Sequence, residues 1–292
     1  MPLYNIYTEQ ELDSKGEKLP PLILGSPKLQ LRFCTEERVA KEWPRGDLIQ
    51  DIFELSNSQL SEQAYVLLPN GCSLLLFILR PHTAGCYFCG PLTTAKKVRI
   101  PVGGKLFGVR IKVGRLNWFY KRLAPELADQ VFPLHRCFFD ADTLLDKLRC
   151  LDTFSDRCAA IFGFFEMNGA AGYRADPLIQ DCINLIQESG GQCRVHDLAE
   201  KSPRSERILS RRFRDMTGLS MKTYCEMVKF QNSFYSIQES RPRILSGAVK
   251  KFGYYDLPHM NRAYRKFINY TASDIRYINM DEMYAQDLFS VS

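Results

Sequence analysis

The sequence predicts an α+β fold, with a β-rich, barrel- or sandwich-like amino-terminal domain and an all-helical carboxy-terminal domain. Three observations support this prediction. Short apolar runs typical of strands are concentrated between residues 63 and 113. From about residue 141 onward, apolar residues recur at helical spacing instead. A small, flexible segment at 168–176 interrupts the helical pattern, and we interpret it as a linker between domains at 1–167 and 177–277.

Composition narrows the class of protein. With 45% hydrophobic and 25% charged residues, the 292-residue chain has the balance of a soluble globular protein. The amino terminus lacks the basic and apolar regions of a secretory signal, and no apolar run approaches the roughly 18 residues of a membrane span. We therefore expect a cytoplasmic protein without membrane partners, whose ten cysteines are mostly reduced thiols.

Charge is distributed unevenly along the chain. There are 39 Lys and Arg against 33 Asp and Glu in total, but the segment 194–276 alone holds 17 basic and 8 acidic side chains. The rest of the chain, with 22 basic and 25 acidic side chains, is slightly acidic. A basic module joined to a mildly acidic one is typical of a nucleic-acid-binding protein with an attached regulatory domain.

The amino-terminal domain contains a series of strand signals. Residues 1 to about 60 carry mixed signals, and no element is predicted there. The tripeptide Pro-Asn-Gly at 69–71 is a strong turn signal after the first predicted strand. In the last predicted strand, at 106–113, Arg110 and Lys112 alternate with apolar residues, which predicts that they lie on a polar face. Helical patterning from about 141 to 167 predicts a helical appendage to the strands. The predicted strands span residues 64–68, 73–80, 87–88, 98–102 and 106–113.

Two segments of the carboxy-terminal domain share one plan: a short helix, a turn and an amphipathic helix. In the first, at 195–220, the second helix follows Ser205, a good N-cap, and stops at Gly218. At about 100° per residue, its apolar residues share one face and its arginines lie on the other. A helix that buries one side and offers three guanidinium groups on the other suits a DNA major groove. The apolar residues are Leu209, Phe213 and Met216, and the arginines are Arg207, Arg211 and Arg214.

The second segment, at 244–267, repeats this plan, and one predicted helix at 221–240 joins the two. Asp256 is expected to cap its second helix, where Pro258 lies in the first turn and its missing N–H is tolerated. A single basic helix face is more often simply solvated, whereas two matching units are a specific signal for DNA binding. Residues 278–292 are expected to form a tail. The predicted buried residues are Met260, Tyr264 and Phe267, and the outer ones are Arg262 and Arg265.

Residues 177–276 resemble the DNA-binding domain of the AraC/XylS family of bacterial transcriptional regulators. Three positions depart from the usual family pattern: Asn269 replaces a Gly, Ala272 a Pro, and Pro258 a small polar residue. The last departure argues against a base contact from that side chain. The resemblance is carried by L-A-E-K at 198–201, S-E-R-I-L-S-R-R-F at 205–213, T-G-L-S at 217–220, F-G-Y-Y-D-L-P-H-M-N-R-A-Y-R-K-F at 252–267 and Arg276.

The amino-terminal half is more loosely similar to the sensor domain of one subgroup of this family. The matching stretches are L-P-N-G-C-S-L-L-L-F at 68–77, F-G-V-R-I-K-V-G at 107–114 and L-A-D-Q-V-F-P-L at 127–134. Together the resemblances imply a sequence-specific transcription regulator, of activator type, that reads two adjacent major-groove segments of double-stranded promoter DNA. The partners implied are RNA polymerase, a small-molecule effector, and a second copy of the chain through the amino-terminal domain. No cofactor, metal or catalytic residue is expected. The residues expected to contact DNA are Arg207, Ser210, Arg211, Arg214, His259, Asn261, Arg262 and Arg265.

Two alternatives stay open from the sequence. Cys86 and Cys89 form a C-x-x-C motif, which elsewhere marks redox or zinc sites, so a metal- or thiol-sensing regulator is the first alternative. Positions three apart on a strand point to opposite faces, which favours structural thiols. A fused enzymatic domain is the weaker alternative, because His82 and His135 are isolated and we find no nucleophile with a partner.

Overall fold

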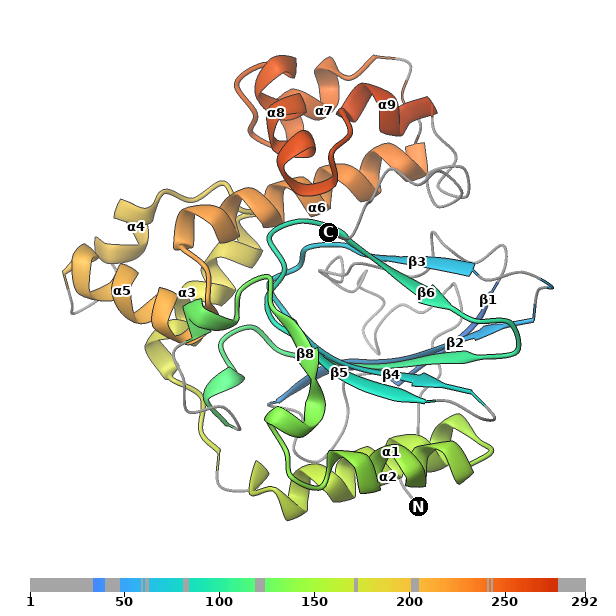
Figure 1. Cartoon of the computed structure of the whole chain (residues 1–292). Coiled ribbons are helices and arrows are strands. Elements are labelled where there is room, and N and C mark those ends of the chain that lie inside the picture. Colours follow the sequence, from blue (N-terminus) through green and yellow to red (C-terminus); the bar gives the residue numbers. More distant parts are fainter. Residues whose placement is uncertain are drawn as a thin grey trace, which may run out of the picture.

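The fold is α+β, as predicted, with antiparallel sheets in the amino-terminal half and helices in the carboxy-terminal half (Figure 1). It is taken from a computed structural model of the chain. Within the described part of the chain, no helix is both long and apolar enough to cross a membrane. The structure describes residues 34–39, 48–58, 60, 63–80, 84–118, 124–170, 173–200, 205–240, 242 and 244–277.

The larger sheet has six strands in the order β1-β2-β7-β4-β5-β8, and every neighbouring pair is antiparallel. At its centre, Leu75 of β4 lies opposite Val109 of β7, and both are fully buried. A second sheet pairs β3 with β6. The predicted strands correspond to β3 through β7, whereas β1, β2 and β8 were not predicted. The strands are β1 (Cys34–Val39), β2 (Ile49–Asn57), β3 (Gln63–Leu67), β4 (Ser73–Leu79), β5 (Gly85–Cys89), β6 (Lys96–Ile100), β7 (Lys105–Ile111) and β8 (Val131–Pro133).

Both faces of the six-stranded sheet are covered, which makes the β-rich half a sandwich with a helical layer. Helices α1 (Ala141–Cys150) and α2 (Phe154–Met167) pack against one face, and the β3–β6 sheet covers the other (Figure 1). The predicted helical appendage is therefore present as two helices. Alternation along the strands separates the two cores: on β5, Phe88 belongs to the helix-side core and Cys89 to the core between the sheets.

Arg110 is buried, although its alternation with apolar residues predicted a polar face. Its side chain is 4% exposed, and its Nη1 lies 2.5 Å from Asp51 Oδ1 on the neighbouring strand β2. Its guanidinium carbon lies 4.3 Å from the centroid of the Phe53 ring. The prediction was wrong because this face of β7 is covered by the β3–β6 sheet and not by water. A charge is tolerated at such a position when an opposite charge pairs with it.

Seven helices follow in the described residues; those predicted from the sequence lie close to their predicted bounds, whereas the last one, Ala272–Tyr277, was not predicted. The joining helix predicted at 221–240 is α6, which runs from Met221 to Ser240. The helix that starts at Pro177 ends before Gly190 and Gly191, whose φ angles of 61° and 76° are left-handed. The turn predicted at 202–204 and the tail at 278–292 lie outside the described residues. The helices are α3 (Pro177–Glu188), α4 (Val195–Glu200), α5 (Glu206–Thr217), α6, α7 (Ser246–Lys251), α8 (Leu257–Ile268) and α9 (Ala272–Tyr277).

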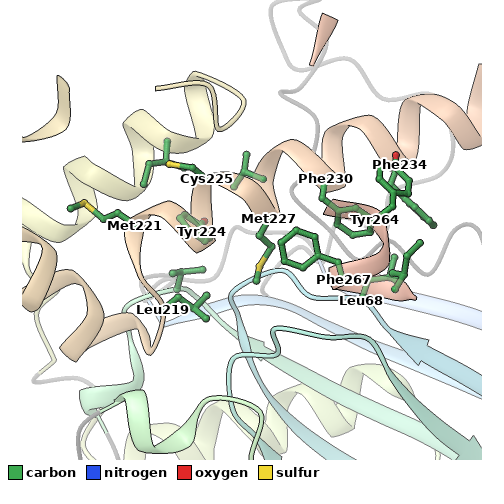
Figure 2. Packing of buried hydrophobic residues seen from close by; sticks show 14 of the residues in the cluster. Leu68, Leu219, Met221, Tyr224, Cys225, Met227, Phe230, Phe234, Tyr264 and Phe267 are labelled. Carbon is green, nitrogen blue, oxygen red and sulfur yellow. The ribbon is translucent and has the colours of Figure 1, made fainter. Parts of the chain in front are cut away.

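Helices α3 to α9 share one hydrophobic core, and α6 runs through the middle of that core. Figure 2 shows Tyr264 of α8 beside Phe230 and Phe234 of α6, with ring centroids 5.0 and 6.4 Å away. The hydroxyl of Tyr264 lies 3.0 Å from Ser233 Oγ, which adds a buried hydrogen bond between the two helices. Burial of so many aromatic groups against one helix fixes α8 relative to α6.

The helical core continues into the β-rich half. Four residues from the sheets and their loops, Val66, Leu68, Cys72 and Val113, belong to the same core as the helices. The side-chain nitrogen of Gln231 on α6 donates to the carbonyl of Pro69, at 2.6 Å. Figure 2 shows Leu68 close to Phe267 at the end of α8. The short 3-10 helices of this half are Leu116–Trp118, Ala124–Leu127 and Leu134–Arg136.

Candidate nucleic-acid interface

Helix α5 starts and stops where its sequence predicts. Ser205 has an extended backbone at the N-cap position, although its side chain accepts no capping hydrogen bond. At the other end, Gly218 adopts φ 79° and donates its N–H to the Arg214 carbonyl at 2.9 Å. This left-handed glycine closes the last turn in the usual way. The two ends therefore fix α5 as a helix of 12 residues.

The two faces of α5 are separated as predicted. Leu209 and Phe213 are fully buried, and Met216 packs against the same core while remaining half-buried. On the other face, the Arg211 side chain is 85% exposed, and its Nε lies 3.7 Å from Asp215 Oδ2. An exposed ion pair of this kind contributes little, so a polyanion can displace the carboxylate. The predicted DNA-contacting residues Arg207, Arg211 and Arg214 are exposed and Ser210 is half-buried.

An ion pair ties α5 to the start of α3. Arg212 Nη2 lies 2.5 Å from Asp176 Oδ2, and the carboxylate is 6% exposed. The other oxygen of Asp176 accepts from the backbone N–H of Leu178 at 3.1 Å, so Asp176 is the N-cap of α3. One carboxylate thus caps α3 and holds α5. This ion pair adds to the core packing of Leu209 and Phe213, which orients α5.

Helix α8 has the second set of predicted caps. Asp256 Oδ1 accepts from the backbone N–H of His259 at 2.6 Å, and Pro258 lies in the first turn. Asn269, at the position where the sequence resemblance leads one to expect glycine, adopts φ 59° and donates its N–H to the Arg265 carbonyl at 3.0 Å. Asn is the residue after Gly that best tolerates this conformation. Met260, Tyr264 and Phe267 are fully buried, as predicted.

The outer face of α8 differs from that of α5. Arg262 and Arg265 are exposed, whereas His259 and Asn261 are half-buried and also hold local structure. His259 Nδ1 accepts from the Tyr255 N–H at 3.3 Å, which leaves the proton of a neutral imidazole on Nε2. Asn261 Oδ1 accepts from the Ala272 N–H at 3.0 Å, at the start of α9. The donor nitrogens of these two side chains remain for an external group.

Helix α6 sets the spacing between α5 and α8. Its 20 residues correspond to a length of about 30 Å at 1.5 Å per residue. Successive major-groove segments on one side of B-DNA are about 34 Å apart. Helix α6 packs on helices of both units through the shared core, and its own length is close to that distance.

The two cysteines of the C-x-x-C motif point to opposite faces of β5, as predicted. Cys86 lies in the helix-side core and Cys89 in the core between the sheets. Burial raises the pKa of Cys86 to about 11 and that of Cys89 to about 12, so both are thiols at neutral pH. Among the described residues, no group of three His, Cys, Asp or Glu side chains is arranged to hold a metal ion. His135 is exposed on a 3-10 helix, and His82 lies outside the described residues.

Several cationic side chains that the sequence analysis did not single out lie near Arg262. They line a cavity of about 510 Å³ between the α3–α4 connection, α6 and α8, together with His259. Two of them come from α6, at positions seven residues apart on one helix face, which is the signal the sequence offered. The others come from elements that only the fold brings together. These side chains are Arg194, Lys222, Lys229 and Lys266.

The chain has distant similarities to known proteins. Residues 46–133 match a domain of unknown function (DUF6597). No curated protein is significantly similar in sequence.

Solved structures of ToxT from Vibrio cholerae are similar in structure to this chain. An apo variant from strain SCE256 has a TM-score of 0.40 and 11% identity, covering 77% of this chain and 96% of that chain. ToxT from strain O395 bound to (E)-4-(8-methylnaphthalen-1-yl)but-3-enoic acid has a TM-score of 0.39 and 12% identity, covering 84% and 98%. ToxT with a bound unsaturated fatty acid has a TM-score of 0.37 and 11% identity, covering 76% and 96%.

Proposed function

We propose that this chain is a sequence-specific DNA-binding transcription regulator of the AraC/XylS type. The observation that supports this most is the recurrence of one unit on both sides of α6. Each unit presents an amphipathic helix that buries apolar side chains and exposes arginines. Two such helices, held by one spacer of about 30 Å, match the geometry of two neighbouring major-groove segments.

Affinity and specificity come from different contacts in this mechanism. Exposed Lys and Arg side chains neutralise phosphates and release counterions, so binding weakens steeply as salt rises. Specificity comes from the few side chains that reach base edges, and Arg207 in the first turn of α5 is the best placed to do so. Because one chain carries both reading helices, a monomer covers two groove segments, and its site need not be palindromic.

The β-rich half is the regulatory part of this proposal. It binds a small effector or pairs with a second copy of the chain, and the bound protein acts on RNA polymerase at a promoter in the bacterial cytoplasm. Its contacts with α6 and α8, through residues such as Leu68 and Pro69, provide a physical path between the two halves. The proposal includes no catalytic step.

Selection of binding sites from random duplex DNA by the full-length chain tests this function. We expect enrichment of a bipartite motif whose two parts lie about one helical turn, 10–10.5 base pairs, apart. The matched control is the double variant Arg211→Ala/Arg262→Ala, which changes two exposed residues and should fold normally. A wild-type chain that enriches no motif, or a control that enriches the same motif equally well, would refute the proposal.

A further inference from the structure

The cavity between the two helix-turn-helix units, termed here the inter-unit cleft, is strongly basic. Three parts of the chain line it: the connection from α3 to α4, the first half of α6, and α8 with Tyr254 in the turn before it. They contribute five Lys or Arg side chains and one carboxylate, Glu226. Glu226 Oε2 lies 2.7 Å from Lys266 Nζ and neutralises that one charge. The cleft therefore has an excess of four positive charges, carried by Arg194, Lys222, Lys229 and Arg262.

Backbone packing builds this arrangement. Gly191 lies so close to α6 that a Cβ atom there would come within 2.2 Å of the Cys225 carbonyl oxygen. Because glycine has no side chain, the α3–α4 connection can lie directly against α6. This contact brings Arg194 to the cleft. On the other side, Lys229 Nζ donates to the Gly253 carbonyl at 3.4 Å, which positions the ammonium group between α6 and the second unit.

The remaining polar groups also favour an anion. His259 lines the cleft, and its Nδ1 accepts from the backbone of Tyr255, so Nε2 carries a proton and can donate to a ligand. Arg194, Lys222 and Arg262 have no ion-pair partner among the residues that the structure describes. A site that offers several cationic donors and a single carboxylate already paired is suited to phosphate groups.

We infer that the inter-unit cleft binds backbone phosphates of the DNA segment that lies between the two reading helices. Arg262 belongs both to the exposed face of α8 and to the cleft, and Arg194 immediately precedes α4 of the first unit. A duplex that meets α5 and α8 in successive major grooves must carry its intervening backbone past α6, where Lys222 and Lys229 stand. This inference rests on the proposed function and adds a third point of contact that reads no bases.

The test compares the full-length wild-type chain with the double variant Lys222→Gln/Lys229→Gln. Dissociation constants are measured over a range of KCl concentrations, on the selected site and on a scrambled duplex. Each lost phosphate contact should flatten the slope of log affinity against log salt by about 0.9. Both duplexes should lose affinity by the same factor, so that sequence preference stays the same. The matched control is Lys147→Gln on α1, an exposed lysine outside the cleft, which should keep the wild-type slope.

The outcomes separate this inference from the proposed function. A wild-type chain that binds no duplex specifically refutes the function and the cleft together. A wild-type chain that binds specifically, with an unchanged slope in the double variant, refutes the cleft alone. Calorimetric titration with inorganic pyrophosphate tests for a soluble ligand. If the wild type binds pyrophosphate, the double variant does not, and the salt slope of DNA binding is the same for both, the cleft binds a soluble phosphate compound and the inference is overturned. Equal unfolding temperatures of variant and wild type establish that the variant is folded.

Discussion

The two reading helices should contribute unequally to specificity, and Arg207→Ala is the perturbation that shows it. Arg207 lies in the first turn of α5, two residues after the N-cap Ser205, and is exposed. The N-terminal residues of a recognition helix are the ones that reach base edges. The matching position of α8 is Pro258, which has no side-chain donor. A guanidinium that grips a guanine edge in bidentate fashion is therefore available to the first helix and lacking at that position in the second.

The magnitude follows from the position of the side chain. A lost bidentate base contact costs about 1–3 kcal/mol, or roughly 5- to 150-fold in preference at one base pair. Because Arg207 is exposed and outside the core, its removal should change the free energy of unfolding by less than about 0.5 kcal/mol. The whole loss should then appear in DNA binding, at one position of the site.

Two comparison variants make this prediction specific. Arg214→Ala, in the last turn of α5, should weaken binding to all sequences alike and flatten the salt slope by about one unit, as loss of a phosphate contact does. Asn261→Ala removes the 3.0 Å hydrogen bond to the Ala272 N–H, which should cost about 0.5–1.5 kcal/mol of stability. It should relax base preference less than Arg207→Ala does.

Site selection from random duplex DNA with each variant, together with denaturant unfolding, is the assay. An unchanged site preference for Arg207→Ala, with wild-type stability, would show that this side chain reads no base. A larger relaxation from Asn261→Ala than from Arg207→Ala would reverse the ranking of α5 and α8. Either result would refute the argument from the first turn of the helix.

Four further predictions follow from burial and from the division of the chain. Phe213→Ala should lower the free energy of unfolding, measured with denaturant, by about 3–5 kcal/mol. Ile208→Ala, whose side chain is 52% exposed on the same helix, should lower it by less than about 0.5 kcal/mol. Similar losses for the two variants would contradict the assigned buried and exposed faces of α5. Burial raises the pKa of Cys86 to about 11, so its alkylation should be slower than that of exposed Cys150 and should keep accelerating as pH rises towards that value, as followed by mass spectrometry; equal rates would contradict this. Metal analysis of protein purified without chelator should give well under one zinc per chain, and stoichiometric zinc lost on Cys86→Ser would favour a metal sensor. Residues 174–292 alone should fold with a lower unfolding temperature than the full chain, because Val66, Leu68, Cys72 and Val113 of the β-rich half complete their core, and should still shift a selected duplex; a folded fragment that shifts none would contradict the proposed boundary.

Local signals predicted most of the helical half of this protein, but not its last helix, α9. Helix periodicity and caps are properties of neighbouring residues, and they act in the same way in any tertiary setting. Asp256 caps the helix that it was predicted to cap, and Gly218 ends α5 where the sequence predicted. Strands β3 to β7 were also visible, because a turn signal and alternating residues mark them. The expected DNA contacts remain predictions, since they concern a partner.

Strand β2 shows what local signals could not determine. Its residues Asp51 and Glu54 are buried, at 6% and 5% exposure, so its sequence does not alternate between polar and apolar in the usual way. They are neutralised by partners far along the chain: Arg110 on β7, and Arg157 on α2, whose Nε lies 2.6 Å from Glu54 Oε2. A carboxylate in a strand predicts a solvent-exposed position unless a cationic partner for it is known. That partner is known only from the folded structure.

The inter-unit cleft depends on tertiary structure in the same way. The sequence determined that α5 and α8 each have a basic face, because a helix places every third or fourth residue together. It did not determine that Arg194 and Arg262, 68 positions apart, line one cavity with two lysines of α6. That arrangement required the close contact of Gly191 with α6 and the packing of α8 against it. A basic face on one helix can be predicted from the spacing of its residues. A basic cleft lined by side chains from separate elements forms only when those elements pack together.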